Sequence, residues 1–223
     1  MKKLFIIANW KSNKTIEDAE RWIHSFKEEL DRNPLDLSSK EIIICPSFSA
    51  LEHTRYCSKN LSLSIKLGAQ NISAFDAGAY TGEVNGLQIK EFADYVIVGH
   101  SERRINFNES TDIIFKKADT ARRYGIVPIF CVQDETTQIP DKISVVAYEP
   151  PSAVGTGNPD TPENAEEIAE KIKGEGKAQF VLYGGSVTSE NVKSFSEKES
   201  IDGFLIGGAS LDPLEFLQII KNA

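Results

Sequence analysis

Polar side chains able to act together on a small molecule follow directly after short apolar runs in this sequence. Asn9 and Lys11 follow the first run, His100 and Glu102 follow a later one, and Glu149 follows a third. Parallel strands that end at one mouth of a barrel bring such groups into a common site. A cation, an imidazole and a carboxylate in one site can move protons on a small anion. These residue types therefore indicate acid–base chemistry.

A second set of residues has the character of a phosphate-binding site. Gly155 lies in the loop after the third of these runs, Ser186 follows a pair of glycines, and Gly207 and Gly208 follow the last apolar run. Glycine lets backbone N–H groups approach a phosphate closely, and a helix N-terminus adds favourable potential. The sequence contains neither a GxGxxG fingerprint nor a Walker sequence, so it does not indicate a nucleotide site.

Composition narrows the function classes. The 223 residues are 40% apolar and 26% charged, as in an ordinary soluble globular protein. The net charge of −8 makes the chain a poor general binder of nucleic acid or of an anionic membrane, so an anionic substrate needs positive charge supplied locally. The first apolar run is too short for a signal peptide, and no segment approaches the length of a membrane span. We therefore expect a cytoplasmic protein.

The cysteine pattern gives no sign of a disulfide framework. Cys45, Cys57 and Cys131 are odd in number and lack CxxC spacing. This usage is typical of reduced thiols in a reducing compartment, and it indicates neither a disulfide framework nor a zinc site. We expect no metal and no cofactor.

The elements that must position these residues alternate along the chain. Eight short runs are apolar throughout, which is typical of parallel strands buried on both faces. The runs are Leu4–Ala8, Ile42–Cys45, Ile65–Ala69, Tyr95–Val98, Ile126–Cys131, Ile143–Tyr148, Phe180–Tyr183 and Gly203–Ile206. Amphipathic stretches between them predict helices over Thr15–Leu30, Phe48–Ser58, Asn85–Glu91, Thr111–Tyr124, Pro162–Lys173, Ser189–Glu197 and Pro213–Lys221.

Two features of this alternation bear on the fold. Thr161-Pro162 and Asp212-Pro213 each place a capping side chain before a proline at the first helical position, which is a strong helix start. Between Cys131 and Ile143 there is room for a turn or two of helix and little more, so the fifth helix must be truncated.

The fold class predicted by this alternation is α/β, either a (β/α)8 barrel, which we favour, or an open doubly wound sheet. No linker or low-complexity segment divides the chain, and we expect one domain over residues 1–223.

Seven segments, taken together, resemble the triosephosphate isomerases over essentially the full length of the chain. In family order they are Ala8-Asn9-Trp10-Lys11, Gly78-Ala79-Tyr80-Thr81-Gly82-Glu83, Gly99-His100-Ser101-Glu102-Arg103-Arg104, Ala147-Tyr148-Glu149-Pro150, Gly155-Thr156-Gly157, Tyr183-Gly184-Gly185-Ser186-Val187 and Gly207-Gly208-Ala209-Ser210-Leu211. The resemblance implies a single (β/α)8 TIM barrel with a truncated fifth helix. It also implies interconversion of dihydroxyacetone phosphate and D-glyceraldehyde 3-phosphate, a step of glycolysis and gluconeogenesis, without a cofactor.

The resemblance also implies a role for each residue. Glu149 corresponds to the general base and His100 to a neutral electrophile that polarises the carbonyl; the family is itself a standard example of both devices. Lys11 and Asn9 supply electrostatic stabilisation, and Glu102 is expected to pair with Lys11. Gly155, Ser186, Gly207 and Gly208 would hold the phosphate.

Two rival functions remain to be weighed. Another phosphate-binding barrel isomerase or epimerase is disfavoured because the Asn-x-Lys, His-Ser-Glu and Tyr-Glu-Pro motifs occur together. A catalytically silent scaffold is disfavoured because Lys11, His100 and Glu149 are all present.

The resemblance further implies an oligomer. The segment Phe75–Glu83 would insert into a neighbouring subunit and bring Thr81 to the partner's active site. We expect a homodimer, with a homotetramer as the alternative.

Three departures from the common family pattern are Ser152 in place of a tryptophan, Val132-Gln133-Asp134 after the fifth strand, and the truncated fifth helix. The Pro150-Pro151 start of the sixth loop and the short fifth helix resemble the archaeal members.

Overall fold

Eight parallel strands close into a barrel in chain order in the computed structural model, which describes residues 3–153 and 155–223. The strands are β1 (Leu4–Asn9), β2 (Lys40–Cys45), β3 (Lys66–Ala69), β4 (Tyr95–Val98), β5 (Val127–Val132), β6 (Val145–Tyr148), β7 (Phe180–Tyr183) and β8 (Gly203–Ile206). Parallel pairing of β1 with both β2 and β8 closes the ring. The barrel prediction is confirmed, and the open doubly wound sheet is excluded.

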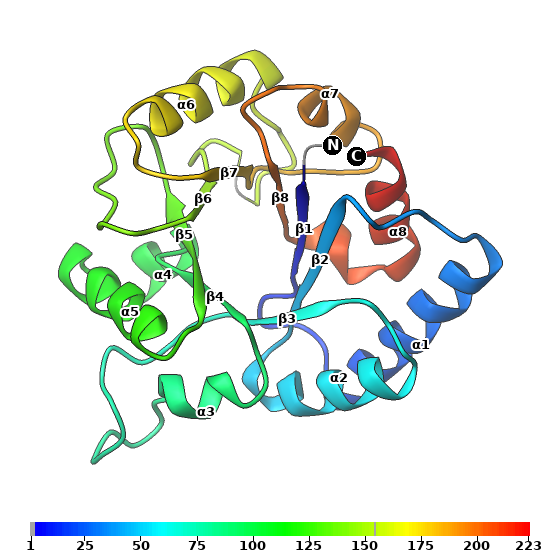
Figure 1. Cartoon of the computed structure of the whole chain (residues 1–223), viewed down its shortest axis with the longest axis horizontal. Helices are drawn as coiled ribbons and strands as arrows, with labels where there is room; N and C mark the ends of the chain where they lie inside the picture. The colour runs from blue at the N-terminus through cyan, green and yellow to red at the C-terminus, as the bar shows by residue number, and fades with distance from the viewer. Residues whose placement is uncertain (1–2, 154) are drawn as a thin grey trace.

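Helices surround the strands on the outside of the barrel (Figure 1). They are α1 (Ile16–Arg32), α2 (Phe48–Asn60), α3 (Gly86–Lys90), α4 (Ser101–Asn106), α5 (Thr111–Arg123), α6 (Pro162–Gly174), α7 (Val192–Ser196) and α8 (Pro213–Asn222), with a short 3-10 helix over Gly208–Leu211. The predicted starts of α6 and α8 are confirmed: Thr161 accepts a hydrogen bond from the Asn164 N–H, and Asp212 accepts from the Leu214 and Glu215 N–H groups. These caps satisfy N–H groups that have no partner within the helix.

The core has two layers because the side chains of a strand alternate between its two faces. Phe5 and Ile7 of β1 belong to an apolar cluster that also includes Ile43, Ile97, Ile129, Val145, Leu182 and Leu205. Ile6 and Ala8 belong to a second, larger cluster formed with the helices. The barrel is therefore filled with side chains, and only its mouth is free to hold a ligand.

The structure corrects the predicted elements in four places. The helix α4 begins immediately after His100 and was not predicted, and neither was the 3-10 helix after β8. Residues 133–144 form turns rather than a helix, so the truncation after β5 goes further than the turn or two expected. The helix α7 is shorter than the predicted Ser189–Glu197.

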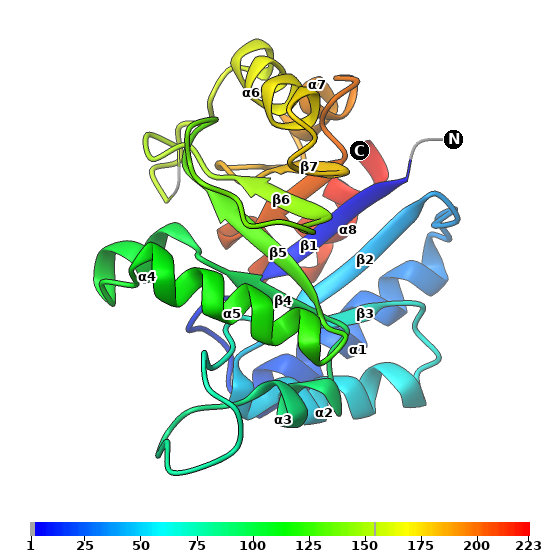
Figure 2. The ribbon, with the colours of Figure 1, turned by 60° about the vertical axis from the view of Figure 1, so that its left-hand side comes forward.

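The connection between β3 and α3 projects away from the barrel as a long loop (Figure 2). It contains Phe75 and Tyr80, whose rings stack with their centroids 4.4 Å apart although both side chains are exposed. Throughout residues 3–153 and 155–223, the helices are too short or too polar to cross a bilayer.

Candidate active site

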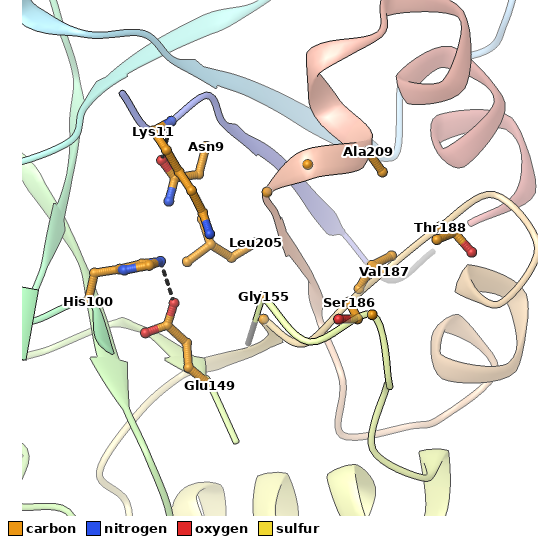
Figure 3. A pocket seen from close by; sticks show the side chains of 14 residues that line it. Asn9, Lys11, His100, Glu149, Gly155, Ser186, Val187, Thr188, Leu205 and Ala209 are labelled. Atoms are coloured by element: carbon orange, nitrogen blue, oxygen red, sulfur yellow. Dashed lines mark hydrogen bonds and ion pairs between the residues drawn. The ribbon is translucent and has the colours of Figure 1, made fainter. Parts of the chain in front are cut away.

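A cavity of about 300 Å³ opens at the carboxyl ends of the strands and brings together nearly all of the predicted site residues (Figure 3). Its lining is Asn9, Lys11, His100, Glu149, Gly155, Gly157, Gly184, Ser186, Val187, Thr188, Leu205, Gly207, Gly208 and Ala209. Glu102 contacts this group through Lys11. Thr81 lies on the projecting loop and does not line the cavity.

Glu149 follows β6 directly and is 1% exposed. Its Oε2 accepts a hydrogen bond of 2.9 Å from the backbone N–H of Ser101, and its Oε1 lies 2.9 Å from Nε2 of His100. Gly184 makes room for this side chain, since a Cβ there would lie 3.0 Å from Glu149 Cγ. The carboxylate is therefore held between two donors at the mouth of the barrel.

His100 is 5% exposed and serves as the N-cap of α4. Its Nδ1 accepts a hydrogen bond of 3.2 Å from the Glu102 N–H, so the proton of a neutral ring must lie on Nε2, facing Glu149. Burial lowers the pKa of His100, but the carboxylates of Glu149 and Glu102 raise it, and the resulting pKa is above its ordinary value. In this state the buried carboxylate of Glu149 and the imidazole of His100 pair with each other.

Lys11 occupies a strained backbone position with φ of 52°, which non-glycine residues rarely adopt. Its N–H donates to Asn9 Oδ1 at 3.2 Å, and its carbonyl accepts from Gln70 Nε2 at 2.9 Å. Its Nζ forms the predicted ion pair with Glu102 at 2.6 Å. A Cβ on Gly207 would lie 3.1 Å from Lys11 Cε, so the absence of a side chain at Gly207 leaves room for the lysine side chain.

The other end of the cavity is made of backbone. Ser186, Val187 and Thr188 follow β7 on the side opposite His100 and Glu149, and Gly155 lies beside them (Figure 3). Gly155 has φ of 71°, a conformation that favours glycine. The hydroxyl of Ser186 donates to the carbonyl of Ala153 at 2.6 Å, so in this structure it holds the sixth loop.

Comparison with known proteins agrees with this geometry. The sequence model of the triosephosphate isomerase family matches residues 4–223. The triosephosphate isomerase of Aquifex aeolicus is 40% identical over 97% of this chain and 98% of its own, and that of Dictyoglomus turgidum is 39% identical over 100% of both. The enzyme of Mesomycoplasma hyopneumoniae is 37% identical over 100% of both chains. The chain belongs to the triosephosphate isomerase family.

The sequence motifs of the family did not identify every residue that builds the site. Gln70 follows β3 directly, and its side-chain amide donates to the carbonyls of both Lys11 and Cys45 at 2.9 Å. Ser101 contributes only its backbone N–H, which no side-chain motif can reveal. Gln70 could have been found by applying the strand-end rule to β3, as it was applied to β1 and β6.

A second cavity of about 260 Å³ shares Asn9, Lys11 and His100 with the first. It extends to Phe48 and Phe107, whose side chains are 39% and 64% exposed. This chain thus has a recess with two phenylalanine rings directly beside Lys11.

None of the three thiols lines the cavity, although Cys131 lies beside Glu149. Cys45, Cys57 and Cys131 are buried free thiols, and burial raises the pKa of Cys131, with a further contribution from the carboxylate of Glu149. In the described part of the chain, the one cluster offering three metal-ligating atoms is Glu20, His53 and Cys57, on α1 and α2. Its carboxylate and imidazole already pair with each other at 3.1 Å and are partly exposed.

Proposed function

We propose that this chain interconverts dihydroxyacetone phosphate and D-glyceraldehyde 3-phosphate by proton transfer through an enediolate. The observation that carries the proposal is a cavity in which Glu149, His100 and Lys11 face glycine-rich backbone. Membership of the triosephosphate isomerase family supports the proposal, which places the enzyme in glycolysis and gluconeogenesis. Neither a metal nor an organic cofactor takes part in this mechanism.

The proposed first step moves one proton. Glu149 removes a proton from the carbon next to the substrate carbonyl, and the electron pair left behind forms the carbon–carbon double bond of the enediolate. The carbonyl oxygen gains negative charge as this happens. Glu149 then returns the proton to the former carbonyl carbon. The hydroxyl proton of the first carbon moves to the former carbonyl oxygen, so that the carbonyl and hydroxyl groups exchange places and the isomerisation is complete.

His100 and Lys11 stabilise the charge that develops on the oxygens. Nε2–H of His100 now donates to Glu149, and a substrate carbonyl placed between them would receive that hydrogen bond instead. Separation from Glu149 also weakens the largest cause that raises the pKa of His100. Burial and Lys11, which lower this pKa, then act against the Glu102 carboxylate alone. Lys11, oriented by Glu102, places its charge beside the same oxygens, and Asn9 holds the lysine backbone.

The phosphate is proposed to bind at the backbone end. Gly155 and Ser186 line that end of the cavity, and Gly207 and Gly208 line it nearer to Lys11, which lies beside Gly207. A phosphate anchored there keeps the reacting carbons at the Glu149 end, and its binding energy can hold the loop Pro150–Gly157 over the substrate. Val154 of this loop lies outside the described residues.

A coupled assay with purified protein tests the proposal. Glyceraldehyde 3-phosphate is supplied as the only substrate, and dihydroxyacetone phosphate is detected by a reductase that consumes NADH. The expected result is turnover on the scale of natural enzymes, about 1–10³ per second. Turnover no higher than that of the Glu149→Gln variant would refute the assignment.

The active assembly is proposed to be a dimer in the cytoplasm, with the chain acting as one domain. The exposed rings of Phe75 and Tyr80 flank the tip that bears Thr81, and the recess beside Lys11 is lined by the exposed aromatic Phe107. A two-fold axis would let each loop fill the partner's recess, with Thr81 beside the partner's Asn9 and Lys11. Light scattering with activity over a dilution series tests this: a fully active monomer contradicts it, and a stable four-subunit mass would replace the dimer by a tetramer.

A further inference from the structure

Asp160, which precedes α6 at the end of the sixth loop, connects two strand ends that flank the proposed base. Its carboxylate Oδ2 accepts a hydrogen bond of 3.1 Å from the hydroxyl of Tyr148. Its backbone N–H donates to the hydroxyl of Tyr183 at 2.7 Å. Tyr148 is the last residue of β6 and Tyr183 the last residue of β7, and the two are paired in register.

The next residue on each of these strands belongs to the site. Glu149 follows Tyr148, and Gly184 follows Tyr183. The Gly184 N–H donates to the Tyr148 carbonyl at 2.8 Å, and the space above the glycine is filled by the side chain of Glu149. The relative position of the β6 and β7 ends therefore decides where the carboxylate of Glu149 lies.

Burial and neighbouring hydrogen bonds stabilise the bond between Asp160 and Tyr148. Tyr148 is only 5% exposed, so its hydroxyl depends on a protein acceptor. Burial and the nearby carboxylate of Asp160 raise the pKa of Tyr148, which keeps the phenol protonated as a donor. Asp160 is held in turn by Asn164 Nδ2 at 2.6 Å and by the Thr161 N–H at 2.8 Å.

We propose that Asp160 is a positioning residue for the isomerisation, because its carboxylate fixes Tyr148 and thereby the placement of Glu149. This inference rests on the proposed function. The residue touches neither the cavity nor the reacting atoms. Its effect should therefore appear in the chemical step, since small misplacements of a reacting group slow that step strongly, while the phosphate end of the cavity is made by other residues.

The test compares Asp160→Ala, Tyr148→Phe and the double variant. We expect each single change to lower kcat about 10- to 100-fold, with KM and the affinity for 2-phosphoglycolate changed less than threefold. The double variant should lose no more than the worse single variant, because both changes remove one interaction. Asp160→Asn retains an acceptor oxygen and should restore most of kcat.

A matched control lies at the opposite end of the barrel. Tyr95, the first residue of β4, donates to the carboxylate of Glu41, so Tyr95→Phe removes a bond of the same kind far from the mouth. It should lower the melting temperature without changing kcat. Should Asp160→Ala fail to fold, Tyr148→Phe alone decides the question, since it keeps the aromatic ring.

The outcomes separate the two proposals. An active wild type with unchanged kcat in folded Asp160→Ala or Tyr148→Phe overturns the positioning role and leaves the isomerase function standing. Multiplying losses in the double variant also overturn it. An inactive wild type overturns the proposed function itself.

Discussion

Replacing Glu149 by glutamine removes one acceptor from a site with two donors. The carboxylate accepts from the Ser101 N–H and faces Nε2–H of His100, each at 2.9 Å. A glutamine amide has one oxygen and one NH2 group, so either orientation leaves an N–H group facing another donor. The side chain is 1% exposed, and water cannot easily supply the missing acceptor.

The expected losses follow from this geometry. Loss of a general base lowers kcat by about 10²- to 10⁴-fold. At about 1.36 kcal/mol per tenfold, this corresponds to about 2.7–5.4 kcal/mol in the activation free energy. The unsatisfied buried donor should lower the free energy of unfolding by about 1–3 kcal/mol, which leaves the protein folded if its stability is typical.

The assay measures kcat, thermal unfolding and binding of 2-phosphoglycolate on the same preparation. Binding should persist, because the phosphate end of the cavity does not involve Glu149. Glu149→Asp serves as the matched control: it keeps the charge, withdraws the carboxylate by one methylene, and should give an intermediate kcat. Turnover near wild type in folded Glu149→Gln would refute the assignment of the base.

Three further predictions concern the remaining parts of the site. Lys11→Met should weaken binding of 2-phosphoglycolate, because Lys11 is the one lysine or arginine among the described residues that line the cavity; unchanged affinity would show that the cation lies elsewhere. The loop Pro150–Gly157 should gain protection from hydrogen exchange when 2-phosphoglycolate binds, and equal protection in the free protein would contradict its role as a lid. Because the folded pKa of His100 is raised, its protonation stabilises the fold fully below the unfolded pKa of about 6.5, and this contribution is lost as the pH rises through the folded pKa. Unfolding measured from pH 5 to 9 should show this loss, and Glu149→Gln should diminish it.

The strands could be predicted from sequence because a parallel strand buried on both faces is apolar throughout, as β4 and β7 are. The helix α4 was missed because its residues Ser101–Asn106 carry no apolar stripe, and the helix is held instead by its cap at His100. The Lys11–Glu102 pair was expected from the resemblance to the triosephosphate isomerases, and the structure contains it.

Other contacts of the site could not be predicted from the sequence. The bonds of Asp160 to Tyr148 and Tyr183 join residues 12 and 23 positions apart, and they exist only because the loop returns to the ends of β6 and β7. Ser186 is expected to bind the phosphate, and in this structure its hydroxyl donates to the carbonyl of Ala153. A loop that folds back over its own strand ends creates such contacts, and local residue patterns do not encode them.

Proton transfer through an enediolate is the central claim, and isomerisation in D2O tests it most directly. Purified protein converts glyceraldehyde 3-phosphate in D2O, and the product is followed by proton NMR with an enzyme-free control. A carboxylate base takes the proton from one carbon before it returns it to the other, and in that interval the proton can exchange with solvent. Deuterium should therefore appear at C1 of part of the dihydroxyacetone phosphate formed. Product formed with complete retention of hydrogen would contradict the account, since it would indicate a direct hydride shift in which Glu149 carries no proton.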